Sequence, residues 1–108
     1  MTAKSPLMLD VTELAIVKAI LARHVPDAVV WVFGSRATGH SKKYSGLELC
    51  IKASHPLDLD VMSALAESFS ESDLPWKVDL VDWYSISDAF RAIIDRDKLL
   101  LQQPSSRA

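Results

Sequence analysis

Apolar residues near the start of the chain recur at the spacing of one helical face. They are Leu14, Val17, Ile20 and Leu21. Asp10, with Glu13 three residues later, matches a helix N-cap and its reciprocal capping partner. Pro26 ends the repeat, so we expect a first helix between Asp10 and Pro26.

A four-residue repeat of apolar positions runs from residue 57 to about residue 70. Its members are Leu57, Val61, Leu65 and Phe69. This period predicts a second long helix. Ser85 with Asp88 is a further helix start signal, and we expect the helix that it opens to run to about Ile94.

Three segments have the composition or the alternation of strands: residues 28–33, 47–52 and 76–83. The first is an unbroken run of apolar residues between a proline and a glycine, which predicts a strand buried on both faces. In the third, Val78, Leu80 and Asp82 share one face. A short terminal strand is expected at residues 99–101.

The expected fold class is α/β, a small mixed sheet of three to four strands with flanking helices. The elements follow in the order helix, strand, loop, strand, helix, strand, helix, with one helical turn allowed in the loop at residues 34–46. We expect residues 1–101 to form a single domain and residues 102–108 a flexible C-terminal tail.

Composition narrows the class of protein. The chain has 108 residues, of which 49% are apolar and 24% charged, as in one soluble globular domain. A net charge of −2 provides no basic excess for bulk nucleic-acid binding, and the longest apolar run of six residues is too short to span a membrane. Cys50, the single cysteine, fits a buried, inert thiol in a reducing compartment. We therefore expect a cytoplasmic protein.

Candidate chemistry begins directly after the first strand, at Gly34-Ser35-Arg36. A glycine and a serine that open a helical turn offer backbone N–H groups and a hydroxyl to a phosphate. The same pair is also common in simple turns. Arg36 either pairs with an anion beside this turn or caps a helix.

Further along the chain, ten residues separate Ser35 from Gly46-Leu47-Glu48, and Asp79 lies on the third strand. This arrangement resembles the minimal nucleotidyltransferases, the MNT proteins of the DNA-polymerase-β-like superfamily. Their pattern is Gly-Ser, ten residues, Asp-x-Asp, and then a third carboxylate on a following strand. The resemblance covers about residues 10–101 and implies the nucleotidyltransferase fold.

The resemblance implies Mg²⁺ and ATP as cofactors. In the family, the paired aspartates hold Mg²⁺ against the nucleotide phosphates, and the third carboxylate helps to activate the attacking hydroxyl. The implied site residues are Gly34, Ser35 and Arg36 for the nucleotide, Glu48 and Asp79 for the metal, and Asp79 for catalysis.

The chain departs from the family pattern at the paired aspartates. Gly46 occupies the position of the first and supplies no ligand, and Glu48 replaces the second with a side chain one methylene longer. Two other acidic sites are interpreted as structural features and not as metal ligands. Asp58-Leu59-Asp60 fits the start of a helix, and Asp82 fits a solvated edge acid.

Many proteins in the family are encoded beside HEPN-domain ribonuclease toxins and act as their antitoxins. The resemblance therefore implies a HEPN-type partner, which the chain binds and neutralises while its own nucleotidyl transfer is lost or impaired. The alternative is an active Mg-dependent adenylyltransferase that moves AMP from ATP to a protein hydroxyl. Nucleotide binding without transfer is a third possibility.

Overall fold

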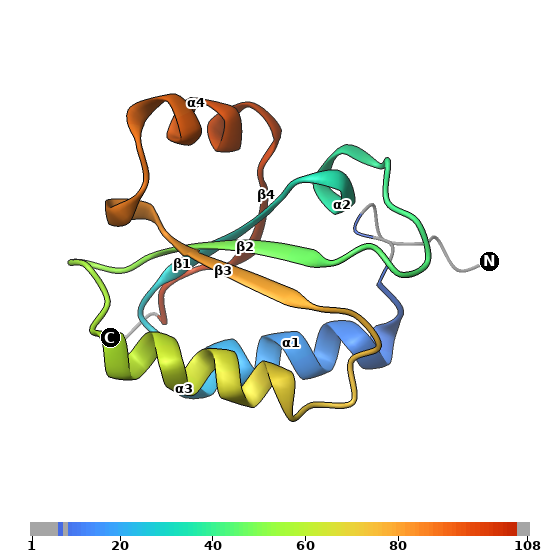
Figure 1. The fold of residues 1–108 in the computed structure, drawn as a ribbon. Helices are drawn as coiled ribbons and strands as arrows, with labels where there is room; N and C mark the ends of the chain where they lie inside the picture. The colour runs from blue at the N-terminus through green and yellow to red at the C-terminus, as the bar shows by residue number, and fades with distance from the viewer. Residues whose placement is uncertain (1–6, 8, 106–108) are drawn as a thin grey trace.

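The computed structural model of the chain describes residues 7 and 9–105 (Figure 1). The elements are α1 (Val11–His24), β1 (Val29–Phe33), α2 (Ser35–Thr38), β2 (Leu47–Lys52), α3 (Leu59–Ser70), β3 (Val78–Asp82), a 3-10 turn (Trp83–Ser85), α4 (Asp88–Asp97) and β4 (Leu99–Gln102). Within this part of the chain, no helix is long and apolar enough to cross a bilayer.

The four strands form one mixed sheet in the order β3-β2-β1-β4. β1 pairs antiparallel with β2 and with β4, whereas β2 and β3 are parallel. Parallel neighbours need a crossover connection, and α3 supplies it. The mixed α/β sheet with flanking helices confirms the fold class expected from the sequence.

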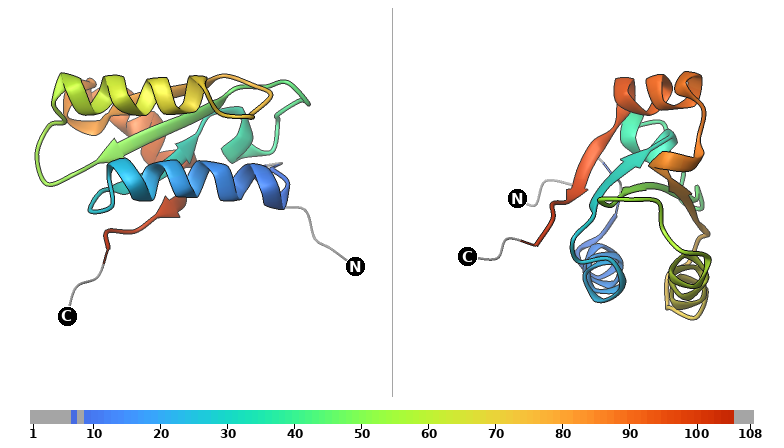
Figure 2. Two further views of the ribbon diagram at one scale, coloured as in Figure 1. Left: turned by 90° about the horizontal axis from the view of Figure 1, so that it is seen from below. Right: turned by 90° about the vertical axis from the view of Figure 1, so that its left-hand side faces the viewer.

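Helices cover the two faces of the sheet unequally (Figures 1 and 2). α1 and α3 lie side by side on one face, and α4 lies on the other. In β2, Leu47, Leu49 and Ile51 are buried in the larger core with residues of α1 and α3. Cys50 faces the smaller core beneath α4, and because side chains alternate along a strand, Glu48 faces that side too.

The capping hydrogen bonds confirm the predicted start of α1 and show that α4 starts later than predicted. Asp10 Oδ1 accepts a hydrogen bond from the Glu13 N–H at 2.7 Å, and Glu13 Oε1 accepts one from the Asp10 N–H at 3.1 Å. α4 begins after Ser87, whose hydroxyl accepts the Phe90 N–H at 3.1 Å. Ser85 was the wrong start because the extended residue that follows it separates its 3-10 turn from the helix.

β4 extends one residue into the segment predicted as a flexible tail. Gln102 is paired in the sheet, and its Nε2 donates to the carbonyls of Val25 at 2.8 Å and Ala28 at 3.0 Å. Beyond it, the Ser105 N–H donates to the Pro26 carbonyl at 2.8 Å. Residues 102 and 105 are therefore hydrogen-bonded to the segment that connects α1 to β1.

The thiol of Cys50 is fully buried, as the sequence predicts. Desolvation, assisted by the negative charge of Asp82, raises the pKa of this thiol to about 11. The reactive thiolate is therefore suppressed near neutral pH, which agrees with the interpretation as an inert core residue.

Asp82 is buried, so its interpretation as a solvated edge acid is wrong. Only 6% of the residue is exposed. Its Oδ2 accepts the Leu57 N–H at 2.8 Å and its Oδ1 accepts the Tyr84 N–H at 3.0 Å. The carboxylate thus joins the end of β3 to the segment that leads into α3. Asp58 does occupy the N-cap of α3, but its side chain makes no capping hydrogen bond.

We predict that Asp82→Ala lowers the free energy of unfolding by about 1–3 kcal/mol, because two partly buried N–H groups lose their acceptor. Asp58→Ala, which removes an exposed carboxylate without a capping bond, should change it by less than about 0.5 kcal/mol. Urea unfolding of the two variants checks this difference. Equal losses would contradict the structural role of Asp82.

Candidate active site

Two carboxylates lie next to each other at the start of the parallel strand pair. Glu48 in β2 is the register partner of Asp79 in β3. Side chains at paired positions of neighbouring strands lie on the same face, here the face that carries α4. Glu48 is partly buried and Asp79 is exposed. The structure therefore brings together the two acids that the sequence predicts as metal ligands.

Gly46 lies beside this pair, although it contributes no side chain. A Cβ placed on Gly46 would lie 4.0 Å from Asp79 Oδ2 and 3.2 Å from the Lys77 carbonyl oxygen. A side chain at position 46 would therefore project toward the Asp79 carboxylate. The contact with Lys77 is tight, so an aspartate at position 46 needs a shift of a few tenths of an ångström.

The carboxylate of Glu48 lies against the backbone of Gly34. A Cβ placed on Gly34 would overlap Glu48 Oε2. The antiparallel register explains this contact, because Glu48 is the partner of Phe33, the residue before Gly34. The longer side chain thus reaches the Gly34-Ser35 turn, where a phosphate would be expected to bind.

The electrostatic environment of Glu48 disfavours its ionised form. Partial burial is the larger cause and the negative charge of Asp79 the smaller, and both raise the pKa of Glu48 above its ordinary value. A bound cation would relieve the repulsion between the two carboxylates. The role of Glu48 and Asp79 as metal ligands stays a prediction.

The Gly34-Ser35 turn has the geometry of a short helix start. Gly34 is the N-cap of α2 with φ 80° and ψ −157°, a backbone conformation that favours glycine. Its carbonyl accepts the N–H groups of Ala37 at 3.0 Å and Thr38 at 3.2 Å. Ser35 opens the helix, where a backbone N–H has no acceptor within the helix. The role of Gly34 and Ser35 in holding a phosphate stays a prediction.

Arg36 does not belong to the nucleotide-binding surface, so the prediction that placed it there is corrected. It is only 2% exposed. Its Nε and Nη2 donate to the Ser45 carbonyl at 3.1 and 2.7 Å, and its Nη1 donates to the Leu7 carbonyl at 3.2 Å. The guanidinium carbon lies 4.7 Å from the centre of the Trp76 ring. Both carbonyl acceptors lie outside the helices.

The contacts of Arg36 give it a positioning role that the sequence did not reveal. It fixes Ser45, the residue directly before Gly46. Ser45 is also held by a turn in which its N–H donates to the Lys42 carbonyl at 3.0 Å and its hydroxyl accepts the Lys42 N–H at 2.7 Å. Arg36 therefore holds the loop in the conformation that places Gly46 beside the carboxylate pair.

The residues present do not fit a magnesium–nucleotide complex as they stand. Mg²⁺ requires near-octahedral oxygen ligands, usually one or two carboxylates together with water and phosphate oxygens. Here Gly46 offers no ligand, and Glu48 turns toward Gly34 instead. Among the residues that the structure describes, no group of three or more acidic, histidine or cysteine side chains is arranged to hold a metal ion.

Comparison with known proteins identifies the family. Residues 16–106 match the family described as "Polymerase beta, Nucleotidyltransferase". The chain belongs to this nucleotidyltransferase family. A Haemophilus influenzae relative named "Probable protein adenylyltransferase MntA" is 50% identical over 103 residues, which cover 95% of this chain and 90% of the relative.

Solved structures of nucleotidyltransferase-fold chains resemble this one. A crystal structure described as a toxin–antitoxin with AMP-PNP has a TM-score of 0.72 at 24% identity, over 85% of this chain and 74% of that chain. A mutant MntA–HpeT toxin–antitoxin has a TM-score of 0.71 at 25% identity with the same coverage. A tri-AMPylated Shewanella oneidensis HEPN toxin in complex with MNT antitoxin has a TM-score of 0.63 at 23% identity, over 83% and 69% of the two chains.

We predict that Gly34→Ala destabilises this nucleotidyltransferase domain by about 1–3 kcal/mol, because side chains rarely adopt its backbone conformation. The added methyl group also overlaps Glu48, so the loss should be smaller in a Glu48→Ala background. Urea unfolding of the single and double variants measures the coupling.

Gly39→Ala is the matched control for this cycle. Gly39 also has a positive φ, 82°, but a Cβ at this position would meet nothing within 4 Å. Its destabilisation should be the same with glutamate or alanine at position 48. A Gly34→Ala loss that is equally independent of residue 48 would contradict the contact between Glu48 and Gly34.

Proposed function

We propose that the chain is a cytoplasmic MNT-type antitoxin that binds and neutralises a HEPN-type ribonuclease toxin, with its own nucleotidyl transfer impaired. The observation that carries the proposal is the combination of an intact family scaffold with an incomplete acid set at positions 46, 48 and 79. Relatives of the same fold occur in toxin–antitoxin complexes, one of them with a HEPN toxin.

Binding and catalysis make different demands on this site. Association with a protein needs a folded surface, and the sheet, its helices and the Gly34 turn are all in place. Nucleotidyl transfer needs a cation that neutralises the negative charge of the phosphates, and Mg²⁺ is that cation in this family. Losing one metal ligand removes several kcal/mol of transition-state stabilisation. A loss of about 1.4 kcal/mol already lowers the rate tenfold.

ATP and Mg²⁺ are expected to bind weakly. Ser35 and the Gly34 backbone would hold the phosphates, and Glu48 and Asp79 would face the metal. For a phosphate to approach Gly34, however, the Glu48 carboxylate must first move away from it. Two carboxylates in fixed proximity still favour a cation, so weak nucleotide binding is compatible with the proposed role.

An active adenylyltransferase is the second candidate. It is favoured by the 50% identity to a relative named as a protein adenylyltransferase, and by a structural neighbour whose toxin partner carries AMP. In that case, Asp79 would lie beside the acceptor hydroxyl, and Glu48 would have to turn from Gly34 toward Asp79. The two candidates differ in whether neutralisation depends on these carboxylates.

The deciding experiment is co-expression with the HEPN-domain protein encoded beside this chain. We predict that the double variant Glu48→Gln, Asp79→Asn still restores growth and still co-elutes with the toxin by size-exclusion chromatography. Both substitutions replace carboxylates that face the candidate site and make no hydrogen bond or ion pair with another described residue.

Thermal unfolding of the double variant provides the control for folding. A folded variant that co-elutes but no longer restores growth would show that transfer carries the neutralisation, in favour of the adenylyltransferase. If the unmodified chain forms no complex, the antitoxin proposal itself is wrong.

A further inference from the structure

β3 lies at one edge of the sheet, and part of its backbone faces outward. The Leu47 N–H donates to the Lys77 carbonyl at 2.8 Å, so that carbonyl points toward β2. Main-chain groups point to alternate sides along a strand, so those of Asp79 also face β2. Those of Val78 and Leu80 point away from the sheet, because β3 is an edge strand whose neighbour in the sheet is β2.

This edge lacks two of the features that usually block strand addition, a bulge and a proline. The pairing of β2 with β3 runs over five consecutive residues without a register shift, and β3 contains no proline. By contrast, the pairing of β4 at the opposite edge has a register shift between Val30 and Trp31. Natural sheets commonly protect an edge with a bulge, a proline, charged side chains or a cover. Of the first three, β3 has the charged side chains alone, with Asp79 exposed.

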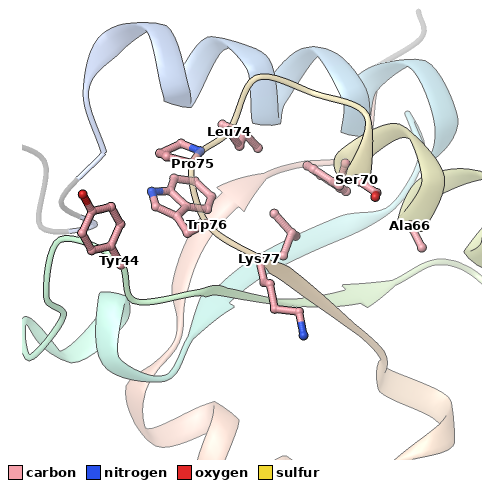
Figure 3. A pocket seen from close by; sticks show the side chains of 9 residues that line it. Tyr44, Ala66, Ser70, Leu74, Pro75, Trp76 and Lys77 are labelled. Atoms are coloured by element: carbon pink, nitrogen blue, oxygen red, sulfur yellow. The ribbon is translucent and has the colours of Figure 1, made fainter.

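A groove follows the same edge, between β3 and α3. Two adjoining cavities of about 480 and 370 Å³ share Ala66 of α3 and Val78 of β3 as lining residues. Figure 3 shows the larger cavity, with Tyr44 at one end, Trp76 in the middle and Ala66 at the other. The smaller cavity reaches Asp79 and Leu80. The groove is therefore continuous with the strand that carries the candidate catalytic acid.

The two faces of the edge offer different environments. Val78 and Leu80 pack against the core beneath α1 and α3, on the side of the groove. Asp79 points to the opposite face, toward Glu48. In a strand added along this edge, side chains would alternate between the groove and the face of the carboxylates.

We infer that the β3 edge is the docking site for an extended segment of the HEPN-type partner, which joins the sheet as a fifth strand. The exposed main-chain groups select an extended backbone, because they recur every second residue. The groove accepts alternate side chains of the segment, and the intervening side chains lie on the face that carries Asp79. This inference rests on the proposed function and adds the surface through which the partner is held.

The alternation of the backbone supplies an internal control. In the complex, hydrogen exchange followed by NMR should slow by about tenfold or more at the amides of Val78 and Leu80. The amide of Asp79, already directed to β2, should change little. Val78 and Leu80 amides that exchange at the same rate in the free chain and in the complex would overturn strand addition.

A pair of alanine substitutions tests the groove separately. Ala66→Arg fills the groove from an exposed position of α3, whereas Ala92→Arg places the same side chain on the exposed surface of α4. Arginine is a good helix former, so both variants should fold. We expect Ala66→Arg to weaken the complex tenfold or more and Ala92→Arg to leave it unchanged. The reverse order, or equal affinities, would overturn the inference.

The outcome for the unmodified chain separates this inference from the proposed function. If no complex with the HEPN-domain protein forms, both are overturned. If a complex forms without protection of the Val78 and Leu80 amides, the antitoxin proposal stands and the β3 edge is excluded as its docking site.

Discussion

The parallel pairing of β2 with β3 is the constraint on which the site depends. It places Glu48 beside Asp79 on one face of the sheet. A parallel pair also requires a crossover, and α3, which provides it, forms one wall of the groove along β3. The same hydrogen bonds that create the carboxylate pair leave alternate main-chain groups of β3 facing outward. The acids, the groove and the free edge are thus consequences of one strand pairing.

We propose that Gly46 and Glu48 impair nucleotidyl transfer while the strand pairing that positions them stays in place. Glycine at position 46 removes a ligand, while the loop that delivers it is still fixed by Arg36 through Ser45. Glutamate at position 48 keeps a carboxyl group, but this group reaches across to Gly34. Catalytic groups can therefore be lost while the packing that presents a binding surface is preserved. This separation supports an antitoxin that acts by binding.

The sequence was sufficient to predict much of the fold, because capping and periodicity leave local signals. The capping box at Asp10 and the alternation at residues 47–52 are examples. Arg36 was misinterpreted because its acceptors are main-chain carbonyls, one of them 29 residues away in Leu7, and carbonyls have no sequence signature. The contact of Glu48 with Gly34 depends on the β1–β2 register and a side-chain rotamer, which periodicity does not determine.

Intact-mass spectrometry after incubation with Mg²⁺, ATP and the HEPN-domain partner shows whether the residues at positions 46 and 48 impair transfer. We expect no AMP adduct on the partner with the unmodified chain. We expect an adduct with the double variant Gly46→Asp, Glu48→Asp, which places two aspartates next to Asp79 and shortens the side chain that meets Gly34. Adducts formed equally well by the unmodified chain would contradict the claim that positions 46 and 48 impair transfer.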